Sequence, residues 1–108
     1  MIKAKFLKKN DKLVAVTLKG HSGYAEEGSD IVCAAATTLS CTIGDGIVNV
    51  LEVKANCSAN EGEIYIDLNG NSASEIQQCQ VLMKTLHLGL KNLELIYGMY
   101  IKVDEEEV

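Results

Sequence analysis

The sequence predicts an α+β fold, a two-layer sandwich in which two helices pack on a mostly antiparallel sheet of about five strands. Two pairs of short segments have strand periodicity and are separated by turn residues, as in hairpins. Two longer segments carry apolar residues at spacings of three and four, as in amphipathic helices. The predicted order is therefore ββ-α-ββ-α-β, and residues 1–108 are of a size that forms a single domain.

The N-terminal part is predicted to form a hairpin followed by a loop. Ile2–Leu7 alternates apolar and basic side chains, and Leu13–Leu18 is rich in β-branched residues, with the turn signal Asn10-Asp11 between them. Residues 20–29 follow neither period. They are predicted to form a loop with conformational freedom because they contain three glycines: Gly20, Gly23 and Gly28.

The first helix is predicted from Ile31 to about Val53, with Ser29-Asp30 as its N-cap signal. One stripe of this helix is apolar and is expected to face the core. A second stripe has mostly small side chains, so another segment can approach it closely: Cys33, Thr37, Ser40, Gly44 and Val48. The glycines at 44 and 46 indicate close packing or a bend in this helix.

The second half of the chain is predicted to contain another hairpin, a helix and a last strand. Lys54–Ala59 and Glu63–Leu68 flank a turn at residues 60–62. A capping box follows at residues 72–75, and apolar residues up to Tyr97 predict a long helix that Gly89 could interrupt. Residues 100–103 alternate again, and the acidic end, residues 104–108, is expected to be frayed and solvated.

Composition and charge exclude several classes of protein. Ten basic and fifteen acidic side chains give a net charge of -5, so a dedicated nucleic-acid binder is not expected. No apolar run approaches the roughly 18 residues of a membrane span, and the lysine-rich N-terminus is unlike a secretory signal, so we expect a cytoplasmic protein without a membrane partner. The four cysteines form no Cys-x-x-Cys pair, so free thiols are expected, with no metal and no cofactor.

Cys33 and His21 are the candidate catalytic pair. If residue 29 or 30 is the N-cap, Cys33 lies in the first helical turn, where free N–H groups and the helix dipole favour a thiolate. His21 follows a predicted strand, so its imidazole could take the thiol proton and return it to a leaving group. Asp30 fits three roles, as a cap, as an orienter of His21 or as a substrate contact, and Thr37 is a packing residue or part of a cleft.

These residues also carry a family resemblance. Residues 20–25, Gly-His-Ser-Gly-Tyr-Ala, and residues 28–35, Gly-Ser-Asp-Ile-Val-Cys-Ala-Ala, resemble the signature of the bacterial ribosomal-processing cysteine protease family, called Prp. The likeness extends over nearly the whole chain. It implies that His21 and Cys33 are the catalytic dyad, that Gly20 and Asp30 match the family's glycine and aspartate, and, more weakly, that Thr37 matches a small hydroxyl residue. The chain departs from the family at residues 97–98, Tyr-Gly, where relatives often have proline after the tyrosine.

The resemblance also implies a function. The enzyme would remove a short N-terminal extension from the precursor of large-subunit ribosomal protein twenty-seven, after an aromatic residue, and would act as a homodimer without a metal. Tyr24 and Thr37 could then border an apolar cleft beside Cys33, while Gly23 and Gly28 would let the loop open and close over the peptide. The small-residue stripe of the first helix and the apolar second helix also favour a homodimer.

Two other interpretations are open at this point. His21 could cap a carbonyl group and Cys33 could be a core residue, in which case the chain would be a non-catalytic ribosome-assembly or protein-binding module. A redox sensor that pairs Cys33 with Cys41 is disfavoured, because eight residues span about 12 Å of helix, too far for a disulfide. His87, the other histidine, is interpreted as structural.

Overall fold

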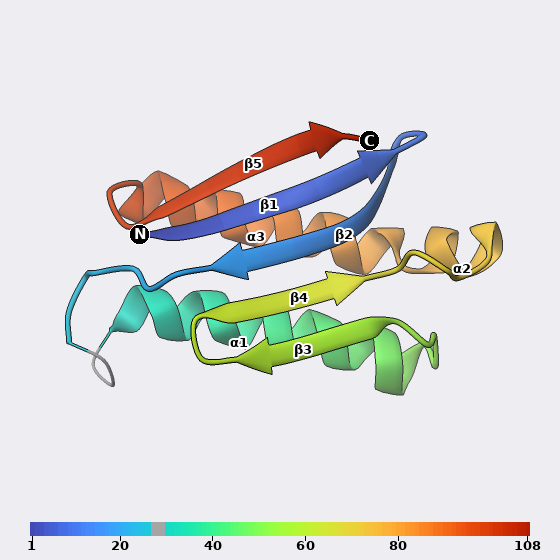
Figure 1. Cartoon of the computed structure of the whole chain (residues 1–108), viewed down its shortest axis with the longest axis horizontal. Helices are drawn as coiled ribbons and strands as arrows, with labels where there is room; N and C mark the ends of the chain where they lie inside the picture. The colour runs from blue at the N-terminus through green and yellow to red at the C-terminus, as the bar shows by residue number, and fades with distance from the viewer. Residues whose placement is uncertain (27–29) are drawn as a thin grey trace.

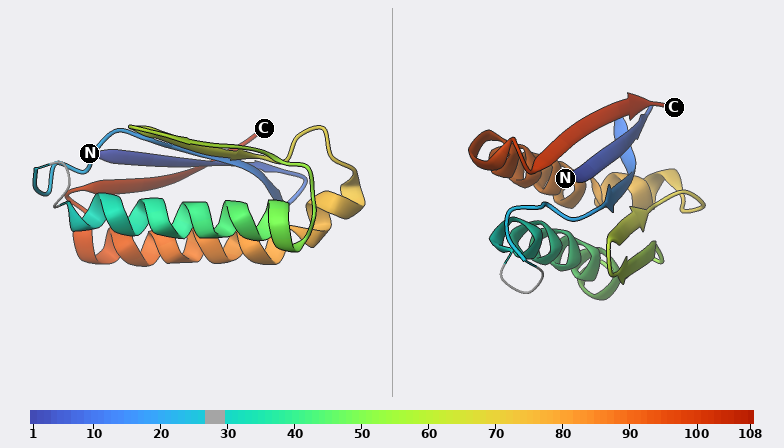
Figure 2. Two further views of the ribbon diagram at one scale, coloured as in Figure 1. Left: turned by 90° about the horizontal axis from the view of Figure 1, so that it is seen from below. Right: turned by 60° about the vertical axis from the view of Figure 1, so that its left-hand side comes forward.

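A five-stranded sheet carries helices on one of its faces, in a computed structural model that describes residues 1–26 and 30–108 (Figures 1 and 2). The elements are β1 (Ile2–Lys9), β2 (Lys12–Lys19), α1 (Ile31–Asp45), a π-helical turn η1 (Gly46–Val50), β3 (Asn56–Asn60), β4 (Glu63–Asp67), α2 (Ala73–Gln78), α3 (Gln80–Tyr97) and β5 (Ile101–Glu107). The strand order is β3-β4-β2-β1-β5, in which β5 runs parallel to β1 and the other pairs are antiparallel. The predicted fold class is confirmed.

Both predicted hairpins are present. The β1–β2 turn passes through Asn10 and Asp11, whose φ angles are 50° and 66°. Two successive positive φ values suit a tight hairpin turn, in which Asn and Asp are favoured. The β3–β4 turn contains Gly62 with a φ of 78°, which glycine adopts without a steric penalty.

The core lies between the sheet and the two long helices, which run side by side (Figure 2). Its largest inaccessible side chains come from both layers: Phe6, Ile66, Leu68, Ile47, Met83, Leu86 and Leu90. The predicted apolar stripe of α1 is buried only in part, because Leu39 is 37% exposed. Leu39 lies against α3, where a Cβ on Gly89 would be 3.6 Å from its Cδ1. Gly89 thus accommodates a neighbouring helix and does not interrupt α3.

The helices end and divide at other places than predicted. α1 does not run as a regular helix to about Val53 but ends at Asp45, and the π-helical turn η1 follows directly from Gly46. The second helical segment divides at Cys79, between α2 and α3, where no glycine or proline marks the division. The predicted capping box at Ser72 is confirmed.

The C-terminal strand is longer than predicted. Residues 104–108 were expected to fray, but β5 continues to Glu107 and pairs with β1 along its length. β1 carries lysines on its exposed face, and Lys5 forms an ion pair of 3.6 Å with Glu106. The expected exposure of residues 104–107 is confirmed, but the expected fraying was wrong, because local composition does not reveal a basic partner strand at the opposite end of the chain.

The segment Ile31–Val50 is long and apolar enough to cross a membrane by length and composition alone, although no uninterrupted apolar run of that length stands in the sequence. Its inner face packs on the core, where Val32 and Ile47 are 0% exposed. Core helices of globular domains reach the same length and composition. We therefore interpret α1 and η1 as a core element of this domain.

Candidate active site

Cys33 lies in the first turn of α1, as the third residue of the helix. Asp30 is the N-cap, and its Oδ1 accepts a hydrogen bond of 2.9 Å from the backbone N–H of Cys33. The capping role predicted for Asp30 is confirmed by this contact. The thiol of Cys33 is partly exposed, as a nucleophile that meets a substrate must be.

Asp30 also ties the preceding loop to the helix. The hydroxyl group of Ser22, which is 3% exposed, donates a short hydrogen bond to Oδ2 of Asp30. Burial alone would raise the pKa of Asp30. Hydrogen bonds from Ser22 and from the backbone of Cys33 and Val32, together with the nearby His21, outweigh burial and hold that pKa below its ordinary value. Sequence reasoning missed Ser22, because a hydroxyl eight residues before a cap gives no local signal.

Asp30 also accepts hydrogen bonds from two backbone N–H groups at the start of α1. The N–H of Cys33 donates to the Asp30 carboxylate, and the N–H of Ala34 donates to the Asp30 carbonyl over 3.0 Å. These two groups are therefore not free to hold an oxyanion. An oxyanion hole in the first turn of α1 therefore finds no support at these two positions.

His21 is held between β2 and the β3–β4 turn. Gly20 has a φ of 96°, and a Cβ at this position would lie 2.6 Å from the carbonyl oxygen of Met1. The backbone N–H of Gly20 donates a hydrogen bond of 2.9 Å to the carbonyl oxygen of Gly62. A Cβ on Gly62 would in turn lie 3.5 Å from Nε2 of His21. The two glycines thus allow the β3–β4 turn to approach the end of β2, and Gly62 also lets it approach the imidazole; sequence reasoning identified only Gly20.

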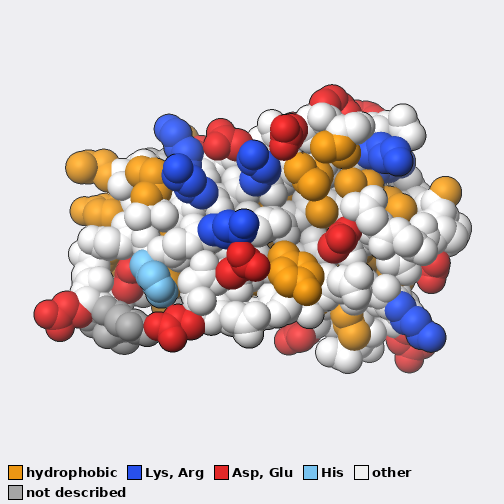
Figure 3. Space-filling view, viewed as in Figure 1, with side chains coloured by type: hydrophobic (Ala, Val, Ile, Leu, Met, Phe, Trp, Pro, Cys, Tyr) orange, Lys and Arg blue, Asp and Glu red, His pale blue; other side chains and the backbone are white. Residues whose placement is uncertain are grey.

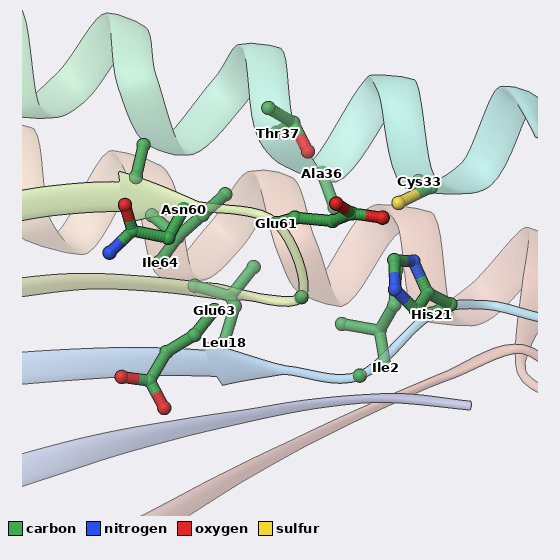
Figure 4. Close-up of a pocket in the computed structure, with 13 residues that line it drawn as sticks. Ile2, Leu18, His21, Cys33, Ala36, Thr37, Asn60, Glu61, Glu63 and Ile64 are labelled. Atoms are coloured by element: carbon green, nitrogen blue, oxygen red, sulfur yellow. The ribbon is translucent and has the colours of Figure 1, made fainter. Parts of the chain in front are cut away.

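Cys33 and His21 line the same pocket, which has a volume of about 330 Å³. Figure 4 shows the thiol and the imidazole at one end of this pocket, with the carboxylate of Glu61 extending toward them. α1 supplies Ala36 and Thr37 to one wall, and the β3–β4 hairpin supplies the opposite wall. The structure therefore brings together the two residues that the sequence singled out for catalysis.

A second pocket, of about 490 Å³, meets the first at Cys33 and His21. It is bordered by Gly23 from the loop and by Asp30 and Thr37 from α1. Thr37 lines both pockets and is exposed, so it can contact a bound molecule. Cys33 is thus accessible from two directions, which an extended peptide passing the thiol requires.

One predicted residue lies away from these pockets, and another is not described. Tyr24 is 41% exposed and packs edge-on against Tyr97 and Tyr100, with ring centroids 5.7 Å and 5.1 Å away, and it lines neither of the two pockets. The aromatic cleft wall expected from Tyr24 is therefore not formed in this arrangement. Gly28 lies outside the described residues, 1–26 and 30–108.

The other titratable candidates have structural surroundings. Cys79 is fully buried, and burial raises the pKa of its thiol, as does the carboxylate of Glu75. His87 lies 3.5 Å from Glu105 and packs edge-on against Phe6. Within the described part of the chain, no three His, Cys, Asp or Glu side chains gather in a way that could hold a metal ion.

The surface around the site is acidic. Glu61 and Glu63 line the pocket, and Glu63 is paired with Lys19 over 3.6 Å. Figure 3 shows acidic and basic side chains interspersed over the face of the sheet, with acidic ones toward the N-terminal end of α1. A thiol, an imidazole and an open cleft can together perform acyl transfer to a cysteine.

Comparison with known proteins agrees with this chemistry. The sequence matches the family described as cysteine protease Prp over residues 1–102. The fold is similar to that of SMU.848 from Streptococcus mutans, with a TM-score of 0.87, 29% identity, and coverage of 100% of this chain and 96% of that one. It is also similar to the essential ribosomal processing protease Prp from Staphylococcus aureus, solved with a covalently linked product peptide, with a TM-score of 0.84, 21% identity, and coverage of 98% and 100%.

A further structure of the Staphylococcus aureus protease, solved with a substrate peptide, gives a TM-score of 0.81 at 20% identity, covering 98% of this chain and 100% of that one. At these identities the two Staphylococcus aureus structures show only that the fold is shared. Among curated proteins no significant match is found. The family match covers nearly the whole chain, including both residues of the candidate pair. The chain therefore belongs to the Prp family and is a cysteine protease.

Proposed function

We propose that this protease removes the N-terminal extension from the precursor of large-subunit ribosomal protein twenty-seven, with Cys33 as the nucleophile and His21 as the base. The observation that carries this proposal is the shared pocket, in which the partly exposed thiol and the imidazole lie at the same end. The family match and the ribosomal processing named for the Staphylococcus aureus relative support it.

The proposed reaction is acyl transfer followed by hydrolysis. His21 takes the proton of Cys33, and the thiolate attacks the scissile carbonyl to form a C–S bond. The imidazolium then gives its proton to the amine as the C–N bond breaks. Water, with its proton taken by His21, attacks the acyl carbonyl; the C–S bond breaks, the new carboxyl end leaves, and the proton returns from His21 to the sulfur of Cys33. Asp30 is not a reacting group in this mechanism. Its carboxylate accepts hydrogen bonds from the backbone N–H of Cys33 and from the hydroxyl group of Ser22, and so holds the helix start and the preceding loop in place.

The charge of the protein suits a basic substrate. The net charge is -5, and Glu61 and Glu63 stand at the pocket that holds the dyad. A lysine-rich segment beyond the scissile bond would be attracted to this surface, and salt would screen the attraction. Ribosome maturation takes place in the cytoplasm, so the proposal places the enzyme there.

The proposal includes a homodimer. α3 leaves large apolar side chains exposed at intervals of seven residues, with Val81 75%, Leu88 62% and Leu95 85% exposed. Such a stripe suits contact with the same face of a second copy. Light scattering at micromolar concentration should therefore give about twice the mass of the 11.7 kDa chain. A mass equal to one chain would contradict the dimer and leave the dyad untouched.

The direct test is incubation with a peptide that covers the N-terminal extension and the first residues after it. Mass spectrometry should show cleavage at one bond, after an aromatic residue, by the wild type and not by Cys33→Ala. A peptide that both proteins bind but neither cuts would favour the non-catalytic binding module. A peptide that neither protein binds would overturn the proposed substrate.

A further inference from the structure

A third hollow lies beside the active-site pocket, further along α1. It has a volume of about 330 Å³ and lies between α1 and the β3–β4 hairpin. We call it the distal groove and define it by six of its residues: Ser40, Cys41, Gly44, Cys57, Ala59 and Ile64. Ala59 and Ile64 also line the pocket of Cys33 and His21, so the two hollows adjoin.

We propose that the distal groove is a substrate subsite that binds an apolar side chain of the peptide several residues away from the scissile bond. This inference rests on the proposed function, since it assumes that a peptide is attacked by Cys33. It goes further, because it assigns part of the protease's preference for particular peptide sequences to the distal groove, away from Cys33 and His21.

The lining selects the chemistry of the occupant. Among the described residues, Asp45 is the one charged residue that borders the groove, and Val48, Ile64 and Ile66 contribute apolar surface. The helix side has small residues, and a Cβ on Gly44 would meet Cys57 and Ile66 at 3.8 Å, an ordinary contact distance. The absence of a side chain at Gly44 leaves space that an aliphatic group can fill.

An unsatisfied hydroxyl group supports a ligand at this place. Ser40 is 1% exposed, and its Oγ has no hydrogen-bond partner within residues 1–26 and 30–108. A buried polar group without a partner is unfavourable, and most buried hydroxyls are satisfied. Because Ser40 lines the groove, a polar group of a bound peptide can supply the missing partner.

The geometry sets the reach of the subsite. Ser40 and Gly44 follow Cys33 by seven and eleven positions, which corresponds to about 10–17 Å along the helix. An extended peptide advances about 3.3 Å per residue. The groove should therefore hold a side chain roughly three to five residues from the scissile bond.

Natural cysteines make the proposal testable by footprinting. Cys41 is partly exposed and Cys57 is exposed, and both line the groove, whereas Cys79 is buried and does not line it, so labelling of Cys79 reports unfolding. The Cys33→Ala variant would be mixed with a peptide that extends about six residues to each side of the scissile bond, enough to cross the groove. Iodoacetamide labelling of each cysteine would be followed by mass spectrometry.

At saturation this peptide should slow the labelling of Cys41 and Cys57 at least about tenfold, because bound chain covers both thiols. A peptide shortened to two residues on one side should lose the protection, and the shortened side identifies the arm that occupies the groove. Unchanged labelling by a peptide that binds Cys33→Ala, as fluorescence anisotropy would show, overturns the subsite. Failure of the wild type to cut the same peptide would instead overturn the proposed function.

Kinetics of Ser40→Ala give an independent test. Loss of one hydrogen bond to the substrate should raise KM for the long peptide roughly five- to tenfold and leave the shortened peptide unaffected. Thr42→Ala removes a hydroxyl group from the same helix outside the groove and should change neither value. An equal effect of Ser40→Ala on long and short peptides would indicate a purely structural role and contradict the subsite.

Discussion

Two cysteines lie near the starts of the two long helices, and their surroundings differ. Cys33 is the third residue of α1, is partly exposed and shares a pocket with His21. Cys79 directly precedes α3, is 0% exposed and belongs to the core. Its N–H donates to carbonyls of α2, so the helical hydrogen bonding continues through it. Placement near a helix start therefore does not make a nucleophile, and access together with a neighbouring imidazole distinguishes Cys33.

The largest expected effect separates these two thiols directly. Cys33→Ala should lower kcat/KM for the peptide at least about 1000-fold, because no other group can form the acyl-enzyme. Its unfolding transition should stay close to that of the wild type, since Cys33 is not fully buried. Cys79→Ala is the matched control, which should retain activity and lose about 1 kcal/mol of stability through a small cavity. Full activity of Cys33→Ala would contradict the mechanism.

Removal of the imidazole should have the next largest effect. His21→Ala should lower kcat roughly 100- to 10,000-fold, the usual range for loss of a general base. Alkylation of Cys33 by iodoacetamide should slow in the same variant, whereas that of Cys41 should not change. Labelling reactions quenched at successive times and analysed by mass spectrometry give the alkylation rates of Cys33 and Cys41. An unchanged rate at Cys33 would mean that His21 does not activate this thiol.

The local features of this fold were predictable from the sequence. The caps at Asp30 and Ser72 and the turn at Asn10 each depend on residues within four positions, so the pattern of side chains contains the whole signal. The placement of Cys33 in the first turn followed from the cap. Its proximity to His21 was predictable because one short loop joins them.

Features that depend on distant partners were not predictable. β5 is ordered to Glu107 by pairing with β1, and Gly62 borders His21 only because the β3–β4 turn folds back to Gly20. The division at Cys79 likewise has no local signal. Tyr24 was expected at the cleft because it lies near Cys33 in sequence, but aromatic contacts with residues of the C-terminal part direct it elsewhere.

The pocket around Cys33 should discriminate between substrates, which the buried site of Cys79 cannot do. Peptides with Phe or Ala before the scissile bond should differ about 100-fold in kcat/KM, because burial of an aromatic side chain contributes about 3 kcal/mol. Measurement at low and high salt should also show slower cleavage of lysine-rich peptides as salt screens the acidic surface. Equal values for Phe and Ala would contradict the aromatic preference.

The smallest expected effect concerns the helix starts themselves. α1 has a side-chain cap, Asp30, whereas no side chain caps α3 at Cys79. Asp30→Ala should lower the free energy of unfolding by about 1 kcal/mol, the usual cost of a lost cap. Asp30→Asn is the control that keeps an acceptor and removes the charge. Urea titrations at neutral pH would measure both variants.

The pH dependence tests whether the charge of Asp30 contributes beyond the cap. Its pKa is lowered in the folded state, because hydrogen bonds and His21 outweigh burial. A carboxylate with a lowered pKa stabilises the fold fully above its unfolded pKa of about 3.9, and this contribution is lost as the pH falls through the folded pKa. The stability difference between the wild type and Asp30→Asn should therefore be constant near neutral pH and shrink below about pH 4. A difference that stays constant down to pH 2 would show that the hydrogen bonds at Asp30 do not depend on its charge.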